Sequence, residues 1–212
     1  FGHPQVALKT LPRNADKYPP VVMTTGCITE KHYSTTKMGY KAAFNHSLSA
    51  LVLEWDEDEF FFTRHLNFDG KGFYDLNHYY STKGKEESKK PIEALITGDE
   101  HAIFSDKEVM DATYYNDDSI VNVLKPKYIV RHDVLDFFSA SHHHRNNVFL
   151  KYAKHHSGGM SSVKKELDDT IKHINDTTPP FSINIMIASN HNEHLMRWLN
   201  DANPKEDPEN AL

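Results

Sequence analysis

The sequence has 212 residues, of which 38% are hydrophobic and 25% charged, as is typical of a folded globular protein. It contains no apolar run of about 18 residues, which excludes a membrane-spanning helix. The formal charge of -6 provides no overall attraction to nucleic acid, and the single Cys27 excludes an intrachain disulfide and fits a reducing cytosol.

The first part of the chain, residues 1–90, is predicted to be β-rich. Apolar segments at 48–53 and 60–63 flank an acidic turn, which indicates a β-hairpin. Trp55 and the aromatic run Phe60–Phe62 are expected in the core of this region. A charged stretch over residues 83–90 is the best candidate for a domain boundary.

Residues 91–212 change character and alternate between strand and helix patterns. Short apolar runs predict strands at 93–97, 127–130 and 183–188, and helices are predicted at about 106–124, 147–156, 162–174 and 193–199, followed by a loop over 203–210. In the third helix, Val163, Leu167, Ile171 and Ile174 recur at helical spacing and are expected to face the core. This alternation predicts a parallel or mixed sheet covered by helices.

Each predicted strand of this part ends in residues that can bind metal. The first ends at Asp99 and is followed by His101, the second is followed by Asp133, and the third by Asn190 and His191. Ligands of such sheets gather at the carboxyl ends of the strands, so these side chains are expected to meet. The alternative is that they are ordinary turn and capping residues.

The capping alternative has most weight at the third strand end. Asn190 followed by Glu193 three positions later matches a capping box at the start of a helix. The same residue can cap the helix and offer its amide oxygen to a metal. At the second strand end, Asp136 is a candidate to orient a metal ligand by contacting that ligand and not the metal itself.

Together these strand ends resemble the motifs of the calcineurin-like metallophosphoesterase superfamily, which carries D-x-H, GD-x-x-D and GNH(D/E) in this order. The matching segments are Asp99-Glu100-His101, His132-Asp133-Val134-Leu135-Asp136 and Ser189-Asn190-His191. The resemblance covers roughly residues 91–200. It implies an α/β (α+β) fold, a β-sandwich flanked by helices, here preceded by the β-rich region.

The resemblance also implies a role for each matching residue. Asp99 and His101 would hold a first metal ion, Asp133 would bridge both ions, and Asn190 would hold the second. His191 would donate a proton to the leaving oxygen or stabilise the transition state. The implied cofactor is a pair of divalent ions, with Mn²⁺ expected and Fe, Zn or Mg as alternatives.

The chain departs from the family pattern in three places. His132 and Ser189 replace motif glycines, and Asn192 stands where a carboxylate normally orients the histidine. The further His and the G-H-x-H motif that complete the family's site are also missing. We expect those ligands outside this chain and the domain to be incomplete at both ends.

The expected function is metal-dependent hydrolysis of phosphodiester bonds, with DNA as substrate. The departures resemble phage-encoded DNA exonucleases related to double-strand-break repair nucleases, which would act in the host cytoplasm. The run His142–His144 with Arg145 either contacts phosphates or forms a polar loop. A phosphomonoesterase, an inactive binding or assembly module with this fold and an unrelated α/β binding domain are the alternatives, and a homo-oligomer is left open.

Overall fold

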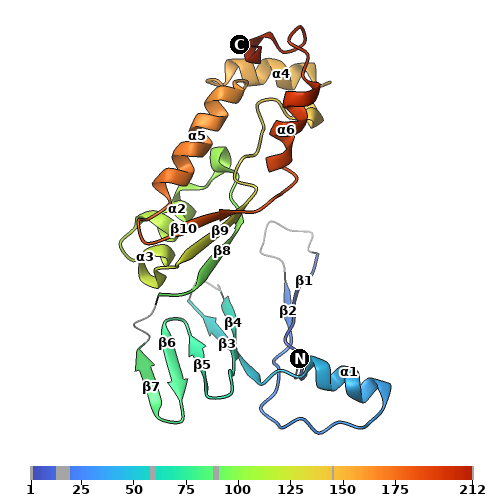
Figure 1. Ribbon diagram of the computed structural model, residues 1–212, viewed down its shortest axis with the longest axis vertical. Coiled ribbons are helices and arrows are strands. Elements are labelled where there is room, and N and C mark those ends of the chain that lie inside the picture. The colour runs from blue at the N-terminus through green and yellow to red at the C-terminus, as the bar shows by residue number, and fades with distance from the viewer. Residues whose placement is uncertain (1, 13–19, 58–60, 88–90, 145, 212) are drawn as a thin grey trace. The chain divides into compact units, whose positions relative to one another are not determined.

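The computed structural model describes residues 2–12, 20–57, 61–87, 91–144 and 146–211. The chain divides into two compact units, Phe1–Lys89 and Lys90–Leu212 (Figure 1). Among the described residues, no helix has the length and apolar character needed to cross a membrane.

The first unit is built from small antiparallel sheets and one helix. Strand β1 (Leu8–Thr10) pairs with β2 (Val21–Met23), β3 (Ser49–Trp55) with β4 (Phe61–Asn67), and β5 (Gly72–Asp75), β6 (His78–Ser81) and β7 (Gly84–Glu87) form a meander. Helix α1 spans Lys37–Asn45. The predicted hairpin is confirmed as β3 and β4, and residues 58–60 of its acidic turn lie outside the described residues.

The aromatic side chains of this hairpin were expected in the core, and that prediction is wrong for those that the structure describes. Trp55 is 75% exposed, and Phe61 and Phe62 are also exposed. Phe60 lies outside the described residues. Because β3 and β4 form a sheet of only two strands, they offer these rings little neighbouring surface to pack against.

The second unit contains the predicted parallel sheet. Its strands are β8 (Ala94–Asp99), β9 (Tyr128–His132) and β10 (Ile183–Met186), in the order β10-β9-β8 and all parallel. The fully buried Ile129 of β9 packs with Val121 and Tyr114 in one core cluster. In Figure 1 the three strands run in the same direction, and the chain leaves β10 towards α6. The mixed α/β character is therefore confirmed.

The first predicted helix of this unit, over 106–124, is broken. The structure has α2 (Lys107–Met110), a π-helical turn (Asp111–Tyr115) and α3 (Ile120–Leu124). The break lies at Asn116–Ser119, where the Ser119 hydroxyl caps α3 by accepting a hydrogen bond from the Asn122 N–H. The serine competes with the helical hydrogen-bonding pattern and starts a new helix.

The remaining helices lie where the sequence predicts them. They are α4 (Val148–His156), α5 (Val163–Asp176) and α6 (Asn192–Asp201), and the predicted terminal loop includes a short 3₁₀ turn at Pro208–Asn210. Val163 is buried in a second core cluster, as expected. Ile171 is 56% exposed, so its expected place in the core is wrong.

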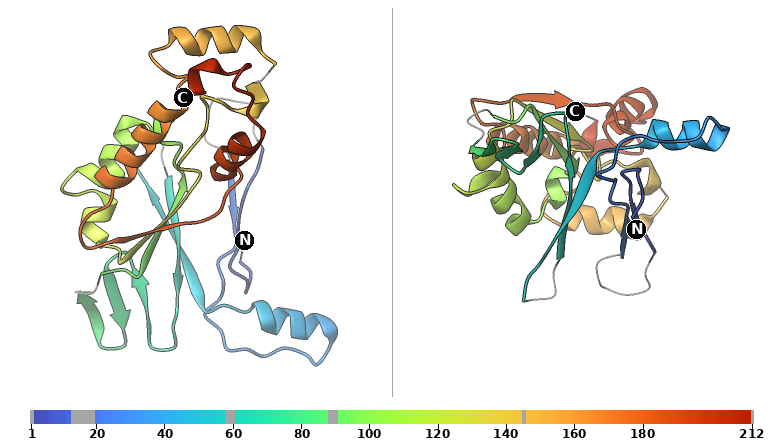
Figure 2. Two further views of the ribbon diagram at one scale, coloured as in Figure 1. Left: turned by 45° about the horizontal axis from the view of Figure 1, so that its top comes forward. Right: turned by 90° about the horizontal axis from the view of Figure 1, so that it is seen from below.

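Helix α4 lies at the end of this unit remote from the sheet, and the carboxyl-terminal residues lie beside it (Figure 2). Asn210 ties that end to the start of α5, since its side-chain oxygen accepts from the Val163 N–H and its amide donates to the Ser161 carbonyl. The ends of the strands therefore meet α6 at the end of the sheet that lies nearer this helix.

Candidate metal centre

The backbone at the ends of β8 and β9 is irregular in a way that turns side chains towards one point. The register between these strands shifts between Ile96 and Asp99, and bulges of this kind commonly re-aim a side chain. His101 and Asp133, which follow the two strands, both have positive φ angles, of 37° and 47°. Non-glycine residues rarely adopt this conformation, and functional sites are enriched in those that do.

A first cluster consists of Asp99, His132 and Asp133. His132 Nδ1 lies 3.2 Å from Asp99 Oδ1 and 3.4 Å from Asp133 Oδ2. The three potential ligand atoms all lie within 4.8 Å of one another. Asp99 and His132 are cross-strand partners, so the parallel pairing of β8 with β9 brings this cluster together.

A second cluster consists of His101, Asp136 and His191, with ligand atoms also within 4.8 Å of one another. His101 Nδ1 lies 2.8 Å from Asp136 Oδ2, as an ion-pair contact without the alignment of a hydrogen bond. The His191 Nδ1 is 2.9 Å from the Asp136 carbonyl oxygen. The rings of His101 and His191 meet edge to face, with centroids 4.8 Å apart.

The two clusters adjoin one another. The His101 N–H donates to the Asp133 carbonyl at 2.8 Å, and the Ala102 N–H donates to the Val134 carbonyl at 2.9 Å. These backbone bonds extend the β8–β9 pairing beyond the strands. Consequently Asp99, His101, Asp133 and His191 gather at one edge of the sheet, as the sequence predicts.

Asp133 is the most constrained carboxylate of the site. Burial raises its pKa, but the Ser189 hydroxyl, His132 and the backbone N–H and charge of His191 outweigh burial and hold the pKa below its usual value. Its Oδ1 is buried and has no hydrogen-bond partner in the structure. An ionised carboxylate with an unpaired buried oxygen fits the role of a metal ligand.

Asn190 occupies a different environment from the other predicted ligands. It lies in the exposed turn between β10 and α6. The predicted capping role belongs instead to Ser189, whose hydroxyl accepts from the Asn192 N–H at 3.2 Å and whose carbonyl accepts from the Glu193 N–H. No hydrogen bond among the described residues joins the Asn190 amide to the two clusters.

A buried ionic network around Glu100 supports the two clusters. Arg131, fully buried in β9, donates to Glu100 Oε2 at 2.8 Å, and the same carboxylate oxygen lies 2.9 Å from His173 Nε2 of α5. Tyr114 and Thr97 donate to the other oxygen of Glu100. This network fixes Glu100 in place. It thereby holds its two neighbours, Asp99 and His101, which can both bind a metal ion.

The sequence analysis did not identify some of the histidines that the structure brings close to other metal-binding side chains. His132 was noted only as a replaced motif glycine, although its position beside Asp133 at a strand end was a usable signal. His142 and His143 were considered as phosphate contacts or loop residues, and their proximity to His194 required the tertiary fold. Arg145 lies outside the described residues.

Comparison with known proteins bears on the origin of the chain. The chain is similar to Protein A1 of Escherichia phage T5, with 38% identity over 218 aligned positions that cover all of this chain and 39% of that protein. The chain thus spans about two fifths of the relative's length. This similarity supports the expected phage origin. No family model matches the chain, and no solved structure matches it.

Proposed function

We propose that residues 91–212 supply part of a binuclear metallophosphoesterase site that hydrolyses phosphodiester bonds, with DNA as the substrate. In this proposal the second unit belongs to the metallophosphoesterase-type β-sandwich. Asp99, His101 and Asp133 hold two divalent ions, Mn²⁺ foremost, and Asn190, which lies apart from the two clusters in this structure, is the further proposed ligand. The remaining ligands come from outside this chain, and the enzyme acts in the host cytoplasm during phage infection.

The observation that carries this proposal is the position of Asp133, which belongs to the first cluster and whose backbone contacts the second. Its carboxylate is close to Asp99 and His132, and its backbone carbonyl accepts from the His101 N–H. The unpaired, buried Oδ1 leaves one oxygen for each of two ions. A bridging carboxylate of this kind is what a two-metal phosphoesterase requires.

The mixture of carboxylate and imidazole groups suits the proposed ions. Carboxylate oxygens favour Mg and Mn, and imidazoles favour Fe and Zn, so Mn or Fe fits a site that holds both. When bound, two such ions neutralise the charge of a phosphodiester and lower the pKa of water. His132, which replaces a motif glycine, adds an imidazole to the Asp99 side of the site.

His191 has the geometry of a proton donor. A carbonyl oxygen only accepts hydrogen bonds, so the contact with Asp136 places a proton on His191 Nδ1. Nε2 is therefore the atom that can carry a second proton and deliver it to a leaving oxygen. The edge-to-face contact with His101 keeps this ring beside the proposed metal ligands.

The choice of DNA over a phosphomonoester rests on the resemblance of the motifs. Lys151, Lys154 and Arg197 line a cavity of about 290 Å³ together with three carboxylates, those of Asp201, Glu206 and Asp207. Its cations and carboxylates are equal in number, so this cavity does not by itself favour DNA over a phosphomonoester.

The proposal is tested on a purified protein that includes all 212 residues of this chain. Mn content and Mn-dependent cleavage of linear double-stranded DNA are measured for wild type and Asp133→Asn, beside a chromogenic phosphomonoester as the second substrate. Asp168→Asn, an exposed change on α5, is the matched control for loss of one carboxylate. We expect Asp133→Asn to lose bound Mn and nearly all cleavage, and the control to retain both.

Three outcomes would overturn the proposal. Equal Mn content in wild type and Asp133→Asn would show that Asp133 does not form part of a metal centre. Tight Mn binding with no cleavage of DNA or of the phosphomonoester would leave an inactive module with this fold. Faster turnover of the phosphomonoester than of DNA would replace the nuclease with a phosphatase.

A further inference from the structure

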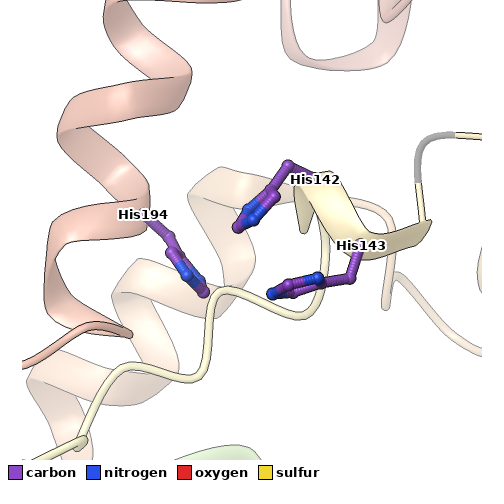
Figure 3. Close-up of side chains that lie close together, drawn as sticks. All are labelled: His142, His143 and His194. Carbon is purple, nitrogen blue, oxygen red and sulfur yellow. The ribbon is translucent and has the colours of Figure 1, made fainter.

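Three histidines form a separate cluster beside the candidate metal centre. His142 and His143 lie in the 3₁₀ turn His142–His144, and His194 lies in α6. Their ring nitrogens lie within 4.8 Å of one another, and Figure 3 shows the three rings converging from the two elements. The ring centroids of His142 and His194 are 4.8 Å apart and those of His143 and His194 are 5.9 Å apart.

His194 supplies a second, independent indication of a ligand. It is 5% exposed, and its Nδ1 is buried without a hydrogen-bond partner in the structure. A buried polar atom without a partner is destabilising, and native proteins rarely retain one without a reason. A metal ion bound by the imidazoles would satisfy the ring.

The chemistry of the cluster differs from that of the candidate centre. It consists of imidazoles, with no carboxylate among the three ligands. Imidazole favours Zn, Cu, Ni and Co, whereas Mg and Mn prefer oxygen ligands. Three histidines with a fourth open position are a ligand set that zinc accepts.

We propose that His142, His143 and His194 bind one zinc-class transition-metal ion, distinct from the two ions of the proposed phosphoesterase site. His142 and His194 also line the cavity of about 290 Å³, which would give water access to such an ion. The inference does not depend on the proposed function, because it uses none of that site's ligands.

Such an ion would have a structural consequence for the neighbouring site. His194 is one helical turn beyond His191, and their ring centroids are 5.0 Å apart. A metal shared by His194 and the 3₁₀ turn would join that turn to α6. The ion would thereby fix the end of α6 from which His191 projects.

The test is a zinc titration by calorimetry on a protein that carries the whole chain, in an Asp133→Asn background that disables the proposed binuclear site. Into this background we place His142→Ala and His143→Ala, which change exposed residues and leave the core intact. His156→Ala, an exposed histidine of α4, is the matched control. We expect one equivalent of zinc in the background and in the control, and none in either test variant.

A second readout covers the case in which Asp133→Asn fails to fold. Zinc is then added to the wild-type protein, to His143→Ala and to His156→Ala during thermal unfolding, and zinc is expected to raise the melting temperature of His143→Ala less than that of the other two. X-ray absorption at the zinc edge should show imidazole scattering in the wild type that His143→Ala weakens. Equal zinc binding and equal thermal shifts in His143→Ala and His156→Ala would overturn the inference, whatever the fate of the phosphoesterase proposal.

Discussion

His191 donates a hydrogen bond from Nδ1 to the backbone carbonyl of Asp136, across 2.9 Å. The family that the motifs resemble normally orients this histidine with a carboxylate that follows it, and this chain has Asn192 at that position. In this chain a main-chain acceptor from the loop after β9 orients the ring. A backbone carbonyl can fix the tautomer of a histidine as effectively as a side chain.

The first prediction concerns His191, the proposed proton donor. His191→Gln should lower the rate of DNA cleavage by about 10²–10⁴-fold, the usual contribution of a general acid, with Mn content unchanged. Asn192→Asp, which restores the family's carboxylate, should leave the rate nearly unchanged because Asp136 already orients the ring. Rates under saturating Mn measure both. A large gain from Asn192→Asp would show that the carbonyl does not fulfil this role.

The three strand ends could be predicted because they depend on local patterns. Apolar runs that end in Asp99 and Asp133 define the strands, and parallel pairing brings such ends together regardless of detail. The trio of His142, His143 and His194 could not be predicted, because no local pattern reports how α6 meets a loop about 50 residues earlier in the sequence. The sequence likewise contained no signal for an exposed Asn190.

The break in the predicted helix over 106–124 has a local cause that was visible in the sequence. Ser119 follows a run of polar residues, and its hydroxyl caps α3. The cap at Asp106 and the stop at Pro126 marked only the outer ends, so one helix looked continuous between them. Trp55 was misplaced for a different reason: hydrophobic residues favour the interior, but a two-stranded hairpin has little interior to offer.

The second prediction concerns His132, which replaces a motif glycine. If its imidazole assists Asp99 and Asp133, then His132→Gly should weaken Mn binding by about 10–100-fold, the range seen when a supporting group of a metal site is removed. Metal titration of wild type and variant measures the change. Tighter binding in His132→Gly would mean that the ring occupies the metal position instead of completing it.

The third prediction concerns the buried carboxylate of Glu100. Burial raises its pKa, but hydrogen bonding to His173 and the charge of Arg131 outweigh burial and lower the pKa from 4.5 to about 2. A carboxyl with a lowered pKa stabilises the folded state above pH 4.5, and this stabilisation is lost as pH falls towards 2. The difference corresponds to about 3 kcal/mol.

Urea unfolding at pH values between 2 and 7 measures this effect. The wild type should lose stability steadily below pH 4.5, and Glu100→Gln should lose less over the same interval because it lacks the titrating group. The variant should also be less stable at pH 7, since Arg131 is then left as a buried charge without its partner, at a cost of about 3–5 kcal/mol. Identical pH dependence in both proteins would contradict the assigned role of Glu100.

The fourth prediction compares Val163 and Ile171 of α5. Their helical spacing predicts the same environment for both, but their environments differ. Val163 is 5% exposed and packs in a core cluster, whereas Ile171 is 56% exposed. Val163→Ala should lower the free energy of unfolding by roughly 2 kcal/mol, through lost burial and the cavity left behind. Ile171→Ala should change it by no more than about 0.5 kcal/mol.

Thermal and urea unfolding of both variants at pH 7 provide the comparison. Ile171→Ala removes more carbon atoms than Val163→Ala, so side-chain size alone would predict the opposite order. The expected order therefore depends only on how deeply each of the two side chains is buried. If Ile171→Ala proved the more damaging change, then a surface from outside this unit would cover Ile171 in the folded protein.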